Sequence, residues 1–354
     1  MKIPPSDQFT TIDLAAHFNA DRNDLDDARI ELVPGGRHIG LQRRPLGRIL
    51  DRAALVVHGK LDDDEIWMAV LTGRGERALA VGEHGHILLS TDSGRSWRQV
   101  PAPTRRMLMG VFLVDDRVAW AVGHQSVILK SGDGGETWAK ANAEPWAKAD
   151  ADEAAYFDIL FLDGQTGFIV GSYGKILTTV DGGENWTEAK QEDDPHFSHI
   201  TPAPDGSLWL CGEYGTVWRS AGSAGNWQPR MTPYDGTFFG VIPLAKGGAV
   251  VFGLRGNIFR SEDGTEWEQV ESPTKSLLHG GLALADDRLL LAAGAGQLLV
   301  SADRGRTFRL AAIAADKTAT VTGLWQAADG GVLLTSDKGV IRLELADLKM
   351  EAAK

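Results

Sequence analysis

SGDGGETW, from Ser131 to Trp138, is the stretch that decides the fold of this chain, because its pattern S-x-D-x-G-x-x-W recurs along the sequence. Residues 90–97 (STDSGRSW) match the pattern fully, and residues 179–186 (TVDGGENW) match it with Thr in the first place. The recurrence, more than any single copy, indicates a repeat architecture. Three further stretches are degenerate copies, at 301–308 (SADRGRTF), 261–267 (SEDGTEW) and 220–227 (SAGSAGNW).

Each copy is interpreted as a tight hairpin turn, a motif called an Asp-box or BNR repeat. An aspartate side chain accepts hydrogen bonds from backbone N–H groups a few residues on, and glycine adopts backbone angles that other residues resist. The tryptophan then folds back as an apolar plug between neighbouring sheets. The predicted role of the boxes is therefore structural, and it falls on Asp92, Asp133, Asp181, Asp263 and Asp303.

The sequence around each box repeats as well. Upstream of each box come an apolar strand, a G-x-x-G-like turn and a second strand, and the aligned turns advance by 41, 48, 41, 41, 40 and 43 residues. A period of this length with several short strands per unit is typical of propeller blades. Seven aligned turns predict an all-β, seven-bladed propeller. The aligned turn residues are Gly85, Ser126, Gly174, Gly215, Gly256, Gly296 and Gly339.

Three parts are predicted along the chain: an N-terminal extension at 1–52, the propeller at 53–345 and a C-terminal tail at 346–354. The last repeat ends after its third strand, whereas the apolar stretch AALVVHG at 53–59 comes just before the first blade. We expect this early strand to complete the last blade and close the ring. Closure removes the unpaired strand edges that invite aggregation.

Charge and composition exclude several classes of partner and site. The formal net charge of −12 argues against nucleic acid or an anionic membrane as the main partner. The single cysteine, Cys211, is expected in the core and excludes a disulfide within one chain. No apolar run is long enough to span a bilayer, so no direct membrane insertion is expected. Without a visible signal peptide the chain is predicted to be cytoplasmic as written, or periplasmic if a leader was removed.

The predicted functional surface is the face that carries the G-x-x-G turns and the loops between blades. The Asp-boxes lie on the opposite face, and the turn residues vary from blade to blade while the boxes repeat, as expected of a binding surface on a rigid scaffold. Trp, Tyr and Arg supply most of the energy at protein interfaces, so we expect a protein or peptide partner. The predicted partner-binding residues are Tyr173, Tyr214, Arg255, Trp146, His84, His124, Arg105, Arg106 and Arg230. The alternative docking element is the arginine-rich arm at 37–52.

No metal site and no cofactor are predicted. His196 and His199 are three residues apart, and on a strand this spacing directs two side chains to opposite faces. His199 falls near the propeller axis, at a place where other inner strands carry a glycine because backbones converge there. Those glycines are Gly110, Gly240, Gly281 and Gly323.

The enzymatic alternative is a glycoside hydrolase, because sialidases and other sugar hydrolases use Asp-box propellers. The F/Y-R-I-P motif of sialidases is absent, as are G-x-S-x-G, P-loop and zinc-binding spacings. Asp158 and Glu213 are two carboxylates that could flank a sugar bond, although the sequence does not fix their separation. No catalytic residue is assigned.

Residues 66–345 resemble the Ycf48/Hcf136-like family of seven-bladed Asp-box propellers. The resemblance rests on V-G-x-x-G-x-I-L-x-S-x-D-G-G-x-T-W runs, which are clearest at 122–138 and 170–186. Characterised members are photosystem II assembly factors, non-enzymatic chaperones for a membrane-protein subunit. The resemblance implies a binding scaffold or assembly factor whose partner is a protein, such as a membrane-protein subunit. Photosynthetic members use a basic patch, and the residues for a comparable patch here are Arg105, Arg106, Arg230 and Arg255.

Overall fold

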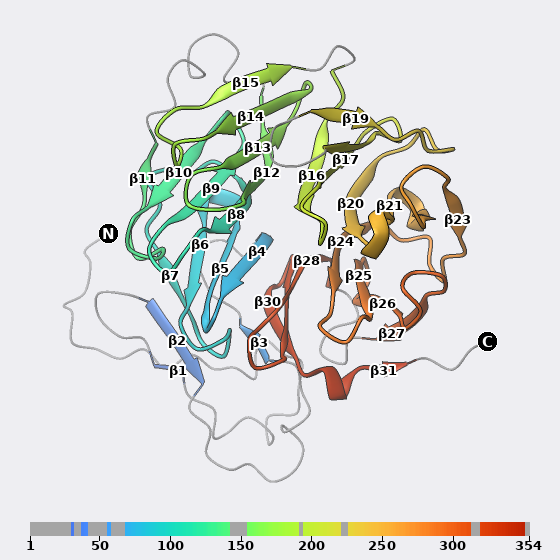
Figure 1. Cartoon of the computed structure of the whole chain (residues 1–354). Coiled ribbons are helices and arrows are strands. Elements are labelled where there is room, and N and C mark those ends of the chain that lie inside the picture. Colours follow the sequence, from blue (N-terminus) through green and yellow to red (C-terminus); the bar gives the residue numbers. More distant parts are fainter. Residues whose placement is uncertain are drawn as a thin grey trace, which may run out of the picture.

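The chain folds into a seven-bladed β-propeller, as the repeat predicts (Figure 1). Inner strands of successive blades contact one another around the whole ring, and the inner strand of the seventh blade contacts that of the first. The computed structural model describes residues 30–31, 37–41, 55–57, 68–141, 154–190, 194–220, 226–312 and 319–350.

Each blade is an antiparallel sheet whose first three strands run in chain order from the inside of the ring outward. Blade 1 contains β4 (Met68–Arg74), β5 (Arg77–Gly82), β6 (Ile87–Ser90) and β7 (Trp97–Val100). Blade 2 contains β8 (Leu108–Leu113), β9 (Ala119–Gly123), β10 (Ile128–Ser131) and β11 (Ala139–Lys140). Blade 3 contains β12 (Tyr156–Phe161), β13 (Gly167–Gly171), β14 (Lys175–Thr179) and β15 (Thr187–Lys190). Blade 4 contains β16 (Phe197–Pro202), β17 (Leu208–Gly212), β18 (Val217–Ser220) and β19 (Trp227–Pro229).

The remaining blades follow the same order. Blade 5 contains β20 (Phe238–Pro243), β21 (Ala249–Gly253), β22 (Ile258–Ser261) and β23 (Glu268–Val270). Blade 6 contains β24 (Leu278–Ala283), β25 (Leu289–Ala293), β26 (Gln297–Ser301) and β27 (Arg309–Ala312). Blade 7 contains β28 (Val321–Gln326), β29 (Val332–Ser336) and β30 (Gly339–Leu343). Among the described residues, short 3-10 turns lie in the connections at Glu83–Gly85, Ala245–Gly247, Leu254–Gly256 and Leu345–Asp347.

The ring is closed by β3 (Leu55–Val57), which supplies the fourth strand of blade 7. It pairs antiparallel with β30, and Val56 lies opposite Ile341. The early part of the chain and its last repeat therefore share one sheet, as the missing final strand predicts.

Strands that lie outside the predicted propeller, before residue 53 and after residue 345, also pair with blades. β2 (Arg37–Leu41) pairs with the outer strand β7 of blade 1, and β1 (Ile30–Glu31) pairs with β2. β31 (Lys349–Met350) pairs with β27 of blade 6. The division at residues 52 and 345 remains a prediction.

The core lies between the blades. The second strand of each blade is buried almost along its whole length because both of its faces pack against a neighbouring blade. Trp120 of β9 illustrates this, since its ring centroid lies 5.6 Å from that of Phe161 and 5.9 Å from that of Trp186, both in blade 3. The apolar position that repeats on these strands has no exposed surface in any blade, at Leu79, Trp120, Phe168, Trp209, Val250, Leu290 and Leu333.

Side-chain hydrogen bonds within the box at 131–138 hold its turn. Asp133 accepts the backbone N–H of Thr137 (2.9 Å) and its hydroxyl (2.5 Å). Ser131 Oγ accepts the N–H of Gly135 (2.8 Å), and the indole N–H of Trp138 donates to the Gly135 carbonyl (3.1 Å). The aspartate thus holds the turn that places the tryptophan between two blades.

Replacing Asp133 with alanine is expected to lower the free energy of unfolding by about 1 kcal/mol, because the side chain is exposed and water reaches the N–H group that it leaves unpaired. Urea unfolding of the full chain measures the change. Asp116→Ala is the matched control, since Asp116 is an exposed aspartate on the same face of the same blade and makes only a 3.8 Å ion pair with Arg74. Equal stability of Asp133→Ala and the parent would contradict a structural role.

The boxes also predict a stability that depends on acid. Hydrogen bonds from the backbone and side chain of Asn185 lower the pKa of Asp181 from 3.8 to about 2, and those from Thr265 do the same for Asp263. Because the folded pKa lies below the unfolded one, these carboxylates stabilise the fold above pH 4, and the stabilisation is lost as pH falls from about 4 to 2. Thermal melts should show a falling Tm in that window, and Asp181→Asn should reduce the fall. A parent Tm that stays constant down to pH 2 would contradict this expectation.

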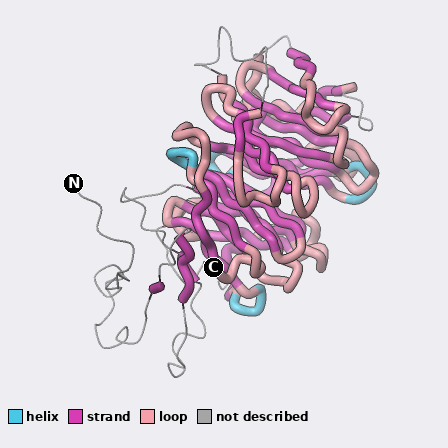
Figure 2. Tube along the Cα trace, turned by 90° about the vertical axis from the view of Figure 1, so that its left-hand side faces the viewer, coloured by secondary structure: helices cyan, strands magenta, loops and turns pink. Residues whose placement is uncertain are grey.

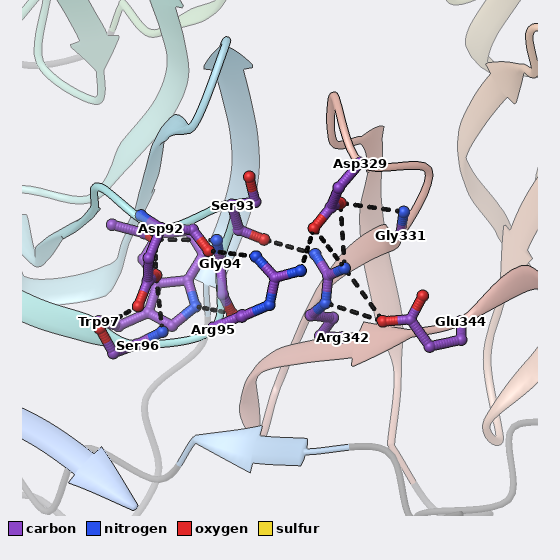
Figure 3. A network of polar contacts seen from close by, with 11 residues as sticks. Asp92, Ser93, Gly94, Arg95, Ser96, Trp97, Asp329, Gly331, Arg342 and Glu344 are labelled. Atoms are coloured by element: carbon purple, nitrogen blue, oxygen red, sulfur yellow. Dashed lines mark hydrogen bonds and ion pairs between the residues drawn. The ribbon is translucent and has the colours of Figure 1, made fainter.

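Basic side chains brace neighbouring blades on the box face, most extensively where the ring closes (Figure 3). Arg342 of blade 7 is buried and donates to the Ser93 carbonyl in the box of blade 1 (2.5 Å). It also binds both carboxylate oxygens of Asp329 (3.0 Å each) and Glu344 (3.0 Å). Arg95 of the same box reaches Asp329 from the other side. Asp329 thus receives a cation from each of the two blades that meet at the closure.

The same kind of brace recurs at other blade boundaries. A basic side chain in one blade donates to a backbone carbonyl in the next box, so the boxes connect blades as well as strands. The pairs are Arg77 with Gly134 (2.8 Å), Lys130 with Gly182 (3.4 Å) and Arg260 with Arg304 (2.9 Å).

The opposite ends of the strands carry the turns and the loops between blades. The strand order places the turn between the second and third strands, and the loop to the next blade, away from the boxes. Figure 2 shows the turns and loops gathered at the two ends of the strands. The face with the turns and inter-blade loops is called the turn face below.

Candidate docking face

Four turns on this face each present one side chain beside a glycine. His84, Tyr173, Tyr214 and Arg255 have φ between 53° and 57°, and the glycine that follows each of them also has a positive φ. Two successive left-handed residues give the twist of a two-residue hairpin turn. All four side chains are exposed, so the variable residue of each turn is displayed on a backbone of fixed shape.

The turn of blade 4 is fastened to the loop that leads to blade 5. Gly215 donates its N–H to the Gly236 carbonyl (2.6 Å), and its own carbonyl accepts the hydroxyl of Thr232 (2.9 Å). A Cβ atom at Gly215 would lie 1.7 Å from the carbonyl oxygen of Tyr234. Tyr214 precedes Gly215, so its backbone is held against the loop to blade 5. The blade 4 turn and this loop are together called the platform below.

Large apolar side chains are exposed on the turn face at and beside this platform. Tyr173 is 40% exposed, Tyr214 70%, Met231 82% and Leu254 36%. All four lie on turns or loops of blades 3 to 5 on the turn face. The fifth exposed large apolar side chain of the described residues, Val180, lies in a box on the other face. Exposed aromatic and apolar side chains on one face make this region a candidate interaction site.

A basic groove adjoins the platform on blade 5. It has a volume of about 430 Å³ and lies between the blade 5 turn and the loop to blade 6. Arg255 and Lys275 are exposed at this groove, and neither forms a hydrogen bond or an ion pair with any described residue. Its lining residues are Arg255, Gly256, Asn257, Gln269, Val270, Glu271, Ser272, Thr274 and Lys275.

An aromatic and acidic cluster lies at the junction of blades 3 and 4. The rings of Tyr173 and His196 meet edge to face, with 5.1 Å between their centroids. Glu213 Oε2 accepts the backbone N–H of His196 (3.1 Å) and lies 3.7 Å from its Nδ1. Phe157 packs on the same histidine, with 6.0 Å between the ring centroids.

Asp158 and His199 form a second pair at this junction, on the inner strands. Asp158 Oδ2 lies 2.7 Å from His199 Nδ1 and accepts the N–H of Ile200 (3.0 Å), while Oδ1 accepts the N–H of Ile159 (2.8 Å). Asp158 Oδ1 is thus held by its own blade 3, and Oδ2 by blade 4. The pair occupies the space where glycines let the inner strands of other blades approach.

Every inner strand has a bulge at its second residue. The extra residue shifts the register, so the bulge determines which residue lies at the position where inner strands approach one another. In blade 6 the glycine in register with Gly110, Gly240 and Gly323 is Gly280, not Gly281 as the sequence alignment predicts. Simple alternation along the strand misses the extra residue.

The predicted partner-binding residues divide into two groups along the ring. Tyr173, Tyr214, Arg230 and Arg255 lie on blades 3 to 5, with the exposed apolar side chains. His84, His124, Arg105 and Arg106 lie on blades 1 and 2 and the loop between them, where Arg106 donates to the Gln125 carbonyl (3.2 Å). Trp146 and the arginines at 43, 44, 48 and 52 lie outside the described residues.

The four arginines expected to form one basic patch therefore lie at two places along the ring. Arg105 and Arg106 belong to the loop between blades 1 and 2, whereas Arg230 and Arg255 belong to blades 4 and 5. Lys275 adds to the second group. Met231 is not among the predicted residues, because a single Met in a polar loop carries no signal until the exposure of its neighbours is known.

Within the described residues, no group of three or more His, Cys, Asp or Glu side chains has a geometry that could hold a metal ion. His196 and His199 are paired separately, with Glu213 and with Asp158. Burial lowers the pKa of a further histidine, His279, whose ring lies 6.1 Å from that of Phe239. None of the helices in the described parts of the chain is long and apolar enough to cross a membrane.

Fold and surface together define a seven-bladed Asp-box propeller with exposed aromatic side chains on its turn face. A family model described as photosynthesis system II assembly factor YCF48 matches residues 89–274, which is more than half of the chain. The chain belongs to this family.

Individual relatives share limited sequence similarity with this chain. Photosystem II stability/assembly factor HCF136, chloroplastic, of Cyanidioschyzon merolae is 36% identical over 70 residues, which are 18% of this chain and 16% of that protein. The match thus spans about one sixth of the curated relative's length.

Two solved structures illustrate the likeness of the fold. A structure described as YCF48 bound to D1 peptide has a TM-score of 0.64 and 18% identity, covering 79% of this chain and 92% of its own. A streptogramin B lyase has a TM-score of 0.67 and 14% identity, covering 83% and 96%. At these identities the likeness concerns the fold alone, because one propeller serves several functions.

Proposed function

We propose that this protein is a non-enzymatic scaffold or assembly factor that docks a protein partner on the turn face of blades 3 to 5. The observation that carries the proposal is the gathering of Tyr173, Tyr214, Met231 and Leu254 on that face. A tyrosine presents a large contact area with few rotatable bonds, so docking on it costs little side-chain entropy.

The family supports a polypeptide partner. Its description names photosystem II assembly, and one structure of similar fold holds a peptide called D1. On that ground we propose that the partner is a protein segment, such as one from a membrane-protein subunit. The cytoplasmic location expected from the sequence is proposed with it, and fractionation of the native cell tests that location.

The partner is to be sought by capture from the native cell with the full chain. Tyr214→Ala combined with Arg255→Ala is expected to weaken capture by about 30-fold, since truncating a central anchor costs about 2 kcal/mol or more. Val180→Ala combined with Arg117→Ala is the matched control, because both residues are exposed on the box face. Quantitative mass spectrometry measures how much of each protein the variants capture relative to the parent.

Three other outcomes would overturn the proposal. Capture that survives the double variant and disappears on deletion of residues 1–50 would move the site to the arginine-rich arm. Capture lost equally in the control variant would show that neither face is specific. Release of sugar from sialosides or β-glucans that disappears in Asp158→Asn or Glu213→Gln would establish a glycoside hydrolase instead.

A further inference from the structure

We propose that the docking face is divided by charge and receives a segment that carries both a cationic side chain and a carboxylate a few residues apart. The cation binds at Glu213 between Tyr173 and Tyr214, and the carboxylate binds at Arg255 and Lys275. This inference rests on the proposed function and specifies its partner.

The cation position follows from the cluster at blades 3 and 4. Glu213 uses only its Oε2 for the contact with His196, and its Oε1 has no partner among the described residues. The side chain of Glu213 is 32% exposed, so this oxygen belongs to an accessible carboxylate. The exposed ring of Tyr173 packs edge to face against His196, and Tyr214 follows Glu213 in the same turn. An accessible carboxylate with exposed aromatic side chains on its own turn and the neighbouring one can bind an ammonium or guanidinium group through charge and the ring faces together.

The carboxylate position follows from the groove on blade 5. Arg255 and Lys275 are both exposed there and have no acidic partner among the described residues, in a chain whose net charge is −12. Glu271 also lines this groove, but it forms no ion pair with either cation. Two uncompensated cations at a concave surface select an anionic group by charge complementarity.

One rigid body carries both positions. The blade 4 turn that holds Tyr214 is bound to the loop before blade 5 through Gly215 and Thr232. Tyr234 of that loop continues the connection, since its hydroxyl lies 3.4 Å from Nδ2 of Asn257, which lines the groove. Because the scaffold fixes the separation of the two positions, we expect the spacing of the two charges along an extended segment, at about 3.3 Å per residue, to decide whether one segment reaches both.

Synthetic peptides test the inference by fluorescence anisotropy on the full chain. Each peptide has a lysine and an aspartate separated by two to six residues, in both orders, around a constant apolar middle. Companion peptides carry Gln for Lys or Asn for Asp. We expect the best doubly charged peptide to lose about 10-fold in affinity with either companion change, since a partly shielded charge contact contributes about 1.4 kcal/mol.

Protein variants assign each charge to its position. Glu213→Gln, which keeps an acceptor for His196, should abolish the preference for Lys over Gln and leave the preference for Asp over Asn. Arg255→Gln with Lys275→Gln should do the reverse. Glu266→Gln and Arg117→Gln, both exposed on the box face, are the matched controls and should change nothing.

The outcomes separate this inference from the function on which it rests. Peptides that bind equally with and without their charges, and lose affinity in Tyr214→Ala, would overturn the charge division and leave the docking face standing. Preferences that persist in the Glu213 and Arg255 variants would overturn the assignment of positions. Binding unaffected by both the charge variants and Tyr214→Ala would overturn the docking face itself.

Discussion

Replacing Arg342 with alanine is expected to lower the free energy of unfolding by about 3 kcal/mol. Removing one partner of a buried ion pair typically costs several kcal/mol, because the groups left behind are desolvated without a partner. Here the Ser93 carbonyl loses its donor, whereas Asp329 keeps Arg95, so we expect the low end of that range. Urea unfolding at pH 7 measures the change as a lower midpoint with an unchanged slope.

Arg95→Ala is the control for the Arg342 prediction. Arg95 binds the same aspartate, but its side chain is 58% exposed, so its loss should cost less than about 1 kcal/mol. The double variant Arg342→Ala, Asp329→Ala should cost less than the sum of the two single changes, because the residues act as a pair. An Arg342→Ala protein as stable as Arg95→Ala would show that the closure does not depend on this network.

Replacing Gly215 with alanine is expected to cost about 2–4 kcal/mol and to weaken partner binding, because two penalties add. The residue has a φ of 65°, and a left-handed conformation costs an alanine roughly 1 kcal/mol. The new Cβ would also meet the backbone oxygen of Tyr234 at 1.7 Å, and overpacking of this kind costs about 1–3 kcal/mol. Either the turn or the loop must move, and Tyr214 moves with it.

Gly75→Ala separates the two penalties. Gly75 has a φ of 60°, but no atom lies within 4 Å of the place that its Cβ would take, so only the conformational cost of about 1 kcal/mol remains. Thermal and urea unfolding of both variants measure how much more stability Gly215→Ala loses than Gly75→Ala. Equal losses in Gly215→Ala and Gly75→Ala would show that the loop yields freely and that the platform is not rigid.

The sequence by itself determined the architecture, because the signals for it are local. The side-chain hydrogen bonds that shape an Asp-box lie within eight residues, as at 131–138, and the turns of blades 1 to 6 each carry a pair of left-handed residues. Regular spacing of such units predicts seven blades, and the missing strand of the last unit predicts closure by the strand at 55–57. Family membership follows from the same local patterns.

Tertiary structure alone decided the relations between blades. Arg342 and Ser93 are 249 residues apart in sequence, and no pattern in either segment indicates that one braces the other. The bulge that places Gly280 on the axis depends on the pairing of two strands. The grouping of Tyr173, Tyr214, Met231 and Leu254 depends on exposure, which a side chain acquires only when its neighbours are packed around it. Local hydrogen bonds and apolar periodicity specify each blade, whereas the ring geometry specifies which side chains share a surface.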